Sequence, residues 1–309
     1  MSYEGDMLTR FGMPTQKAVE QALLRVLLQN GGTITEFGSG EKLVEELANE
    51  FELNEQQRSI ALETIYRKEG RLKKSLLWHR LLFRSADSLA KQNLVSRPTH
   101  TLALTGKREW MLTEKGFDEA LKLSNIPAAW KEVLPTKSFE VEKIVKKLMA
   151  APRRENYNPV DANKPVKKTA RQAVLRSRSF RLAVAEAYKF RCAMCGLKMR
   201  SPDALFWEVE SAHIVPNRLF GRDDVCNGIA LCRFHHWAFD LGWFTLSEGY
   251  GIRVSPKVSS LPDDYGRMHG FDVVRSTAKA TSRINLPASE DIYPHPNSIL
   301  WHNQNVFCK

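Results

Sequence analysis

The first part of the chain carries apolar residues at the spacing of helices. In residues 15–29, apolar side chains recur every three or four positions along one helix face, and a pair of glycines follows as a stop signal. A shorter version of the pattern covers residues 41–51, and Asn54 is of a residue type that caps helices. The pattern therefore predicts three helices, the third running from Asn54 to Tyr66.

A fourth predicted helix, over residues 75–91, has one apolar face and one charged face. The apolar face consists of Trp78, Leu82, Ala86 and Leu89. The charged face consists of Arg80, Arg84, Asp87 and Lys91.

Two short strands are predicted after this helix, at residues 94–97 and 109–112, around a polar tip at residues 105–108. Thr113 then starts another helix, with Glu114 in its first turn. A winged helix-turn-helix has this order of elements: several helices, a helix with basic residues on its outer face, and a hairpin with a basic tip. We therefore expect residues 1–125 to form a winged-helix domain that reads DNA.

The basic residues of this predicted domain are candidates for contact with DNA. If its last long helix enters the major groove, they reach phosphates or guanine edges. A solvated charged face is the alternative. The candidate DNA-binding residues are Arg80, Arg84, Lys91, Lys107 and Arg108.

Residues 126–170 have the composition of a linker. They contain one amphipathic helix, at residues 139–149, and then a basic stretch rich in Pro and Asn that is expected to stay extended. The basic stretch fits either a solvated tether or a segment that follows phosphates. We expect the second domain to begin at residue 171 and to run to residue 309.

Composition and charge narrow the class of partner. Hydrophobic residues make up 43% of the 309-residue chain, as in ordinary globular proteins, but the net charge is +11. Such a surplus points to a polyanion, and no apolar run approaches the roughly 18 residues of a membrane span. The N-terminus has acidic residues and no export signal. Nucleic acid, rather than a membrane, is therefore the expected partner, and the cytoplasm the expected location.

The cysteines indicate a metal site. All five lie in the second half, and an odd number without an export signal argues against a disulfide framework. Cys192 and Cys195 form one CxxC pair, and Cys232 and His235 form a CxxH pair. Two such pairs supply the four tetrahedral ligands of a structural Zn²⁺. Cys226 and Cys308 are expected to be passive.

The segment between the two pairs has the pattern of a hairpin followed by a helix. Residues 207–216 form a predicted strand with His213 on it, and residues 225–242 form a second strand and a helix. His235 and His236 are adjacent and therefore point to different sides of that helix. One can bind zinc while the other faces a cleft, and the sequence leaves open which does which.

These residues resemble the HNH endonuclease family. The likeness rests on AHIVP with His213, CNG with Asn227 and HHWAFD with His236, and it extends over residues 176–307. It implies a ββα-metal nuclease domain, so that the whole chain is of the α+β class. It also implies that His213 is the general base, that His236 binds a catalytic Mg²⁺ or Mn²⁺, and that Asn227 pins the loop and orients the base. The implied products carry 5′-phosphate and 3′-hydroxyl ends.

One position departs from that family. Many members have an aspartate or a second histidine before the base as a metal ligand, whereas this chain has Ala212. Either Glu210 or Asp240 takes over that role, or water completes the metal's coordination.

The N-terminal half has a resemblance of its own. MPTQKAVEQALLRVL and LAKQNLV…WMLTEKGFDEAL, within residues 13–123, are similar to the N-terminal domain of Mrr-type restriction enzymes. A DNA-recognition domain joined to a nuclease domain suggests a restriction enzyme that acts on double-stranded DNA. Whether it recognises modified bases is left open by the sequence. A zinc-containing DNA-binding regulator with an inactive HNH core is the alternative, and a mobile-element nuclease a third. Cutting both strands calls for a homodimer or two successive nicks.

Overall fold

The computed structural model of the chain describes residues 3–35, 37, 42–66, 71–162, 169–257 and 283–307, without the side chains of residues 64–66, 71–73 and 170. The chain forms two compact units. One contains residues 1–131 and 136–140, and the other contains residues 132–135 and 141–309.

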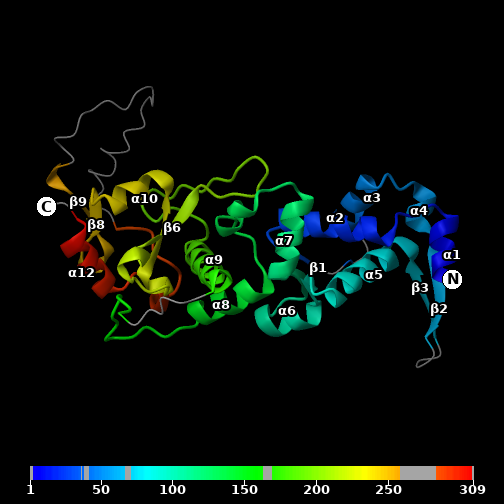
Figure 1. Ribbon diagram of the computed structural model, residues 1–309, viewed down its shortest axis with the longest axis horizontal. Helices are drawn as coiled ribbons and strands as arrows, with labels where there is room; N and C mark the ends of the chain where they lie inside the picture. Colours follow the sequence, from blue (N-terminus) through cyan, green and yellow to red (C-terminus); the bar gives the residue numbers. More distant parts are fainter. Residues whose placement is uncertain are drawn as a thin grey trace, which may run out of the picture. The chain divides into compact units, whose positions relative to one another are not determined.

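The first unit combines helices with two small antiparallel sheets (Figure 1). Its helices are α1 (Tyr3–Arg10), α2 (Gln16–Gln29), α3 (Lys42–Glu50), α4 (Glu55–Ser59), α5 (Leu77–Lys91), α6 (Pro98–Thr105) and α7 (Glu114–Leu123), followed by the 3-10 helix η1 (Ala128–Glu132). Its strands are β1 (Thr33–Thr35), β2 (Ala61–Tyr66), β3 (Arg71–Leu76), β4 (Val95–Ser96) and β5 (Glu109–Leu112).

The core of the first unit lies around α2, which packs against both α5 and α7. Trp78 and the three other residues of the predicted apolar face of α5 are all buried, as the helical spacing predicted. The strands β1, β5 and β4 form an antiparallel sheet in that order, while β2 and β3 pair separately. The helical segments at residues 15–29 and 41–51 and the cap at Asn54 also agree with the sequence-based prediction.

Two segments of this unit differ from the prediction. The helix expected to reach Tyr66 ends at Ser59, because the alternating and β-branched residues that follow pair as β2 with β3. The connection expected to be a simple polar tip between β4 and β5 contains α6. Pro98 favours the first turn of that helix, and Gly106 ends it with a φ of 77°. The winged-helix assignment stays a prediction.

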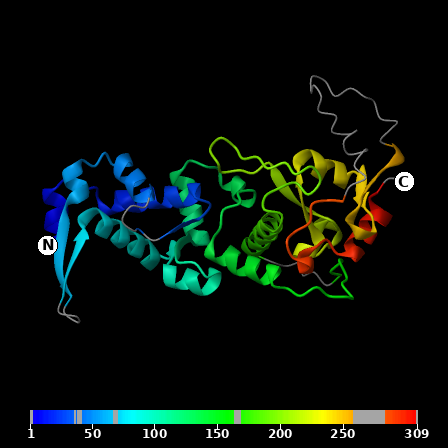
Figure 2. The same ribbon diagram turned by 180° about the vertical axis from the view of Figure 1, so that it is seen from behind.

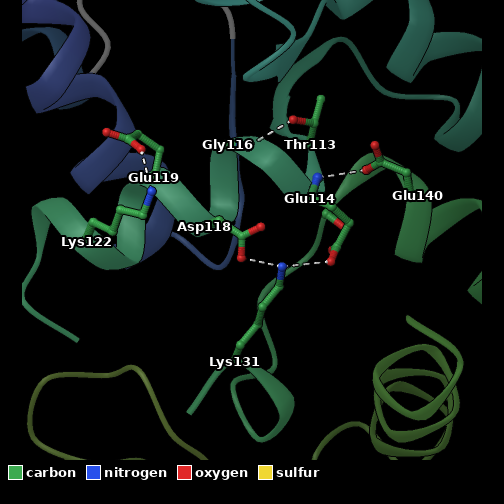
Figure 3. Close-up of polar contacts among 9 residues, drawn as sticks. Thr113, Glu114, Gly116, Asp118, Glu119, Lys122, Lys131 and Glu140 are labelled. Carbon is green, nitrogen blue, oxygen red and sulfur yellow. Dashed lines mark hydrogen bonds and ion pairs between the residues drawn. The ribbon is translucent and has the colours of Figure 1, made fainter. Parts of the chain in front are cut away.

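A charged network around the buried Glu114 fastens Lys131, Ser138 and Glu140 to α7 (Figure 3). The Lys131 ammonium group lies 3.2 Å from a carboxylate oxygen of Glu114 and also pairs with Asp118. The Ser138 hydroxyl donates to Glu114, and the Glu114 backbone N–H donates to Glu140 over 2.9 Å. The Glu114 carboxylate is therefore buried with its charge compensated.

The second unit is built around an antiparallel hairpin. Its helices, counting α8 that begins in the first unit, are α8 (Phe139–Met149), α9 (Ala170–Ala187), α10 (Arg233–Asp240) and α12 (Pro296–Asn305), with 3-10 turns η2 (Asn217–Leu219), η3 (Val225–Asn227), η4 (Glu248–Tyr250) and η6 (Glu290–Ile292). Its strands are β6 (Val209–His213), β7 (Gly228–Cys232), β8 (Phe244–Leu246) and β9 (Ile252–Val254).

Both α9 and α10 pack on the β6–β7 hairpin, and α12 packs on β8 (Figures 1 and 2). Strand β6, strand β7 and helix α10 therefore form the predicted ββα arrangement. Gly228 lies opposite His213 in the hairpin, and a Cβ added to it would lie 2.4 Å from a Val184 methyl group and 3.0 Å from the Phe180 ring. Glycine at this position lets α9 lie directly on the strands.

The segment after α8 packs on the second unit rather than remaining a free tether. Tyr157 is buried, and its carbonyl accepts a hydrogen bond from Asn297 over 2.8 Å. Val160 forms an isolated antiparallel bridge with Gly221, and the Arg222 guanidinium donates to the Asn158 carbonyl. The irregular composition predicted an extended chain here but not these contacts. Residues 163–168 of the basic stretch, and also Cys308, lie outside the described residues.

Candidate active site and metal centre

Two turns at opposite ends of the hairpin sequence converge on one cluster of thiols and imidazole. The donor atoms of Cys192, Cys195, Cys232 and His235 all lie within 4.8 Å of one another. The backbone N–H of Ala193 donates to the Ala230 carbonyl over 2.7 Å, which ties the first turn to β7. Strand β7 ends at Cys232 and α10 begins at the next residue, which brings the second pair to the same place.

The cluster fits a structural Zn²⁺. Three sulfurs and one imidazole nitrogen are a common zinc donor set, and sulfurs on a tetrahedral zinc lie about 3.8 Å apart. The Cys195 and Cys232 sulfurs are 4.0 Å apart, and the Cys192 sulfur lies 3.7 Å from Nδ1 of His235. Hydrogen bonds from neighbouring cysteines lower the pKa of Cys192. The predicted convergence of the four ligands is confirmed.

The same geometry decides between the two adjacent histidines. His235 is buried and belongs to the thiol cluster, whereas His236 lies outside it and lines a cleft. Cys226 is not part of the cluster. Burial raises the pKa of Cys226 to about 11, which keeps it a neutral thiol near neutral pH.

His213 is held by two side chains at the end of β6. Its ring stacks on Phe180 of α9, with centroids 3.8 Å apart and planes inclined by 14°. Its Nε2 lies 3.2 Å from Oδ1 of Asp223, whose side chain is only 10% exposed. Because an ionised carboxylate only accepts hydrogen bonds, this contact favours the imidazole tautomer that has its proton on Nε2 and Nδ1 as the acceptor.

Asp223 has further partners besides the imidazole. Its Oδ1 accepts a hydrogen bond from the Asn217 side chain over 2.8 Å, and its Oδ2 lies 3.3 Å from the Arg176 guanidinium. Sequence inspection did not single out Asp223. In the sequence, Asp223 is marked only by its position in the GRDD loop between the two strands, and other residues of that loop could equally have contacted His213.

Asn227 is fully buried and pins the loop between the strands. Its side-chain oxygen accepts from the Val215 backbone N–H over 3.0 Å, and its amide donates to the carbonyls of Val215 and Arg222. Its backbone carbonyl accepts from Ile214, the residue after His213. Asn227 therefore fixes the loop that delivers Asp223, and acts on His213 only through the backbone and that loop.

His236 lies between two carboxylates. Its Nδ1 is 2.9 Å from Oε2 of Glu210 on β6, and its Nε2 is 3.6 Å from Oδ2 of Asp240, one turn further along α10. The hydrogen bond from His236 lowers the pKa of Glu210, whereas burial raises the pKa of Asp240. The two side chains that the sequence offered as replacements for Ala212 therefore both lie beside His236.

His213 and His236 line the same cleft, which has a volume of about 1160 Å³. Its acidic residues are Glu132, Asp223 and Asp240, and its basic residues are Arg176, Arg181 and Arg218. A cleft that combines arginines, imidazoles and carboxylates suits a phosphodiester with a divalent cation, because the arginines can contact the phosphate and the carboxylates can bind the cation.

Residues 192–247 match the family model described as HNH endonuclease. This match contains both candidate zinc-binding pairs, His213, Asn227 and His236, and we refer to residues 192–247 as the HNH domain. No curated protein matches the chain. Among solved structures, a modification-dependent restriction endonuclease named TagI is similar at 18% identity with a TM-score of 0.31, over 46% of this chain. That similarity spans 44% of the TagI chain.

The candidate DNA-binding residues belong to the first unit. Arg80 and Arg84 on α5 both pair with Glu4 of α1, at 2.6 Å and 3.6 Å. Lys91 pairs with Asp87 at 3.0 Å. Lys107 and Arg108 are exposed in the turn after α6. The Glu4 pairing was not foreseen, because α1 is distant from α5 in sequence.

None of the helices in the described part of the chain combines the length and apolar character needed to cross a bilayer.

Proposed function

We propose that this protein is a metal-dependent DNA endonuclease. The observation that carries the proposal is that His213 and His236, from the strand and the helix of one ββα unit, line the same cleft of an HNH domain, together with arginines and carboxylates. In the proposed roles, His213 takes the proton of the attacking water and His236 binds a divalent cation. The zinc cluster holds the two ends of the unit together and takes no part in the reaction.

Glu210, His236 and Asp240 are the residues that would hold the catalytic Mg²⁺ or Mn²⁺. Their oxygen and nitrogen donors suit such a cation, and carboxylates around one imidazole supply the negative charge that offsets it. When bound, the ion stabilises the charge that develops on the phosphate and on the leaving 3′ oxygen. Products with 5′-phosphate and 3′-hydroxyl ends are part of the proposal.

The chain's own residues prepare His213 for its role. Asp223 holds the proton on Nε2, so that Nδ1 accepts the proton of water, and the carboxylate stabilises the imidazolium that forms. The Phe180 ring fixes the plane of the imidazole. Asp223 is thus a positioning residue that acts through His213.

The first unit is proposed to select the DNA. The exposed basic residues Arg84, Lys91, Lys107 and Arg108 support this role. A selecting unit joined to an HNH domain favours restriction of foreign double-stranded DNA, with modified bases as a possible target class. A homodimer would place two such clefts on the two strands.

The test is nicking of supercoiled plasmid in Mg²⁺ or Mn²⁺, with DNA modified in different ways as competing substrates. We expect the wild type to nick and His213→Ala to lose nicking while it still binds DNA. His100→Ala changes an exposed histidine of the first unit and serves as the matched control. Binding without cleavage on every substrate would instead identify a zinc-containing DNA-binding regulator with an inactive HNH core, which the alanine at position 212 favours.

A further inference from the structure

Two exposed apolar side chains, Leu219 and Phe220, line the cleft. Leu219 ends η2, and Phe220 follows it. Leu219 is 46% exposed and Phe220 is 51% exposed, and both line the cleft that contains His213 and His236. A large aromatic ring that is exposed to water beside the candidate active site calls for an explanation.

Phe220 also has a backbone conformation that a bulky residue rarely adopts. Its φ is 63°, in the left-handed region where glycine is the usual residue. Two other aromatic residues share a positive φ, and both have ring partners: Phe190 lies 4.8 Å from Trp207, and Tyr250 lies 5.5 Å from Tyr293. Within the described residues, no ring contact compensates the strain at Phe220.

The loop holds Phe220 in a fixed position. The backbone N–H of Phe220 donates to Asn217 over 3.0 Å, and its carbonyl accepts from Asp161 over 2.8 Å. The next residue, Gly221, is packed so closely that an added Cβ would lie 1.8 Å from the Val215 carbonyl oxygen. These contacts fix the backbone that carries the ring at the cleft.

We propose that Phe220, supported by Leu219, inserts between neighbouring base pairs of duplex DNA beside the phosphate that is cut. Proteins that bend DNA insert apolar side chains between base steps in this way, and aromatic rings stack on any base. The occupant is a nucleic acid rather than an apolar peptide, because the same cleft contains His213 and His236 of the HNH domain and three arginines that can contact phosphates. This inference rests on the proposed function and specifies how the substrate is distorted.

The experiment uses the full chain and a plasmid fragment in which 2-aminopurine replaces a fraction of the adenines. Fluorescence of 2-aminopurine rises when a base loses its stacking partner. All binding measurements are made in a His213→Ala background, so that the DNA stays uncut. Phe220→Gly removes the ring and relieves the positive φ, so it folds at least as well as Phe220→Trp, which keeps a stacking ring. Leu300→Ala, at a 54%-exposed apolar residue of α12, is the matched control.

We expect binding to raise the fluorescence, and Phe220→Gly to lower that rise and the cleavage rate of the otherwise intact enzyme by about fivefold or more. Phe220→Trp and Leu300→Ala should retain both. Equal fluorescence in Phe220→Gly and its parent, or no rise when the parent is bound to DNA, would overturn the insertion. A fluorescence rise that depends on Phe220 in a protein that never cuts would support insertion while the proposed function fails.

Discussion

Replacing Asp223 by asparagine tests the proposed chemistry of His213 most directly. The substitution preserves the shape of the side chain but removes its charge. The amide can still accept a hydrogen bond from Asn217 at Oδ1, where the carboxylate now accepts one over 2.8 Å. It can no longer form a charge-assisted contact with Nε2 of His213, now at 3.2 Å, or with the Arg176 guanidinium at 3.3 Å.

The expected effect follows from the burial of this pair. The side chains of His213 and Asp223 are 19% and 10% exposed, so water only partly screens the carboxylate. A hydrogen bond to a charged group contributes about 1.5–3 kcal/mol. Because the imidazolium forms only as the proton is transferred, the loss falls on the transition state and corresponds to about 10- to 150-fold in kcat.

The assay is single-turnover plasmid nicking at saturating enzyme, with DNA affinity, zinc content and Tm measured in parallel. We expect Asp223→Asn to lose rate while its Kd, zinc content and Tm change little, since Asp223 does not belong to the zinc cluster. The ¹⁵N shifts of His213 should show a smaller population of the tautomer protonated on Nε2. Asp291→Asn, at an exposed aspartate of η6, is the control. Nicking by Asp223→Asn at the wild-type rate, or a loss of DNA binding that accounts for the whole defect, would refute the assigned role.

Three further predictions concern the zinc cluster, a buried histidine and the network of Figure 3. Cys195→Ser, or treatment with a strong chelator, should remove about one zinc per chain and unfold the HNH domain, as metal analysis and circular dichroism would show. Burial lowers the pKa of His302 to about 4 from 6.5, so the unfolded chain binds more protons and stability should fall by up to about 3 kcal/mol between pH 6.5 and 4. His302→Gln should flatten that part of the pH profile in denaturant unfolding. Lys131→Met, which leaves the buried Glu114 charge without its ammonium partner, should destabilise the first unit by about 1–3 kcal/mol and leave zinc content unchanged.

Each of these has a contradicting outcome. Full zinc content in Cys195→Ser would mean that the cluster does not bind as inferred. A wild-type slope in His302→Gln between pH 6.5 and 4 would show that other groups, rather than His302, set the acid sensitivity. An unchanged unfolding midpoint in Lys131→Met would mean that the contact to Glu114 contributes nothing net.

Much of the second unit follows from local sequence. The spacing of Cys192 and Cys195 and of Cys232 and His235 places each pair in one turn, so only the meeting of the two turns had to come from the fold. The strand with His213 and the helix from Arg233 to Asp240 were predicted because periodicity and the glycine after the helix are local signals.

Other features depended on contacts between segments distant in sequence. The strand β2 replaced a predicted helix because it could pair with β3, and α6 replaced a simple tip because Pro98 and Gly106 begin and end a helix there. Likewise, the segment from Tyr157 to Val160 became ordered because other parts of the second unit supply its hydrogen bonds.

The candidate active site also has features that follow from the sequence and features that depend on the tertiary structure. Sequence alone determined which residue types could bind zinc, accept a proton and hold a divalent cation, because these are chemical properties of the side chains. Only the tertiary structure decided that His235 joins the thiols, that His236 lies between Glu210 and Asp240, and that Asp223 holds His213. A side chain's partner depends on which distant segment packs beside it, and neither spacing nor composition contains that information.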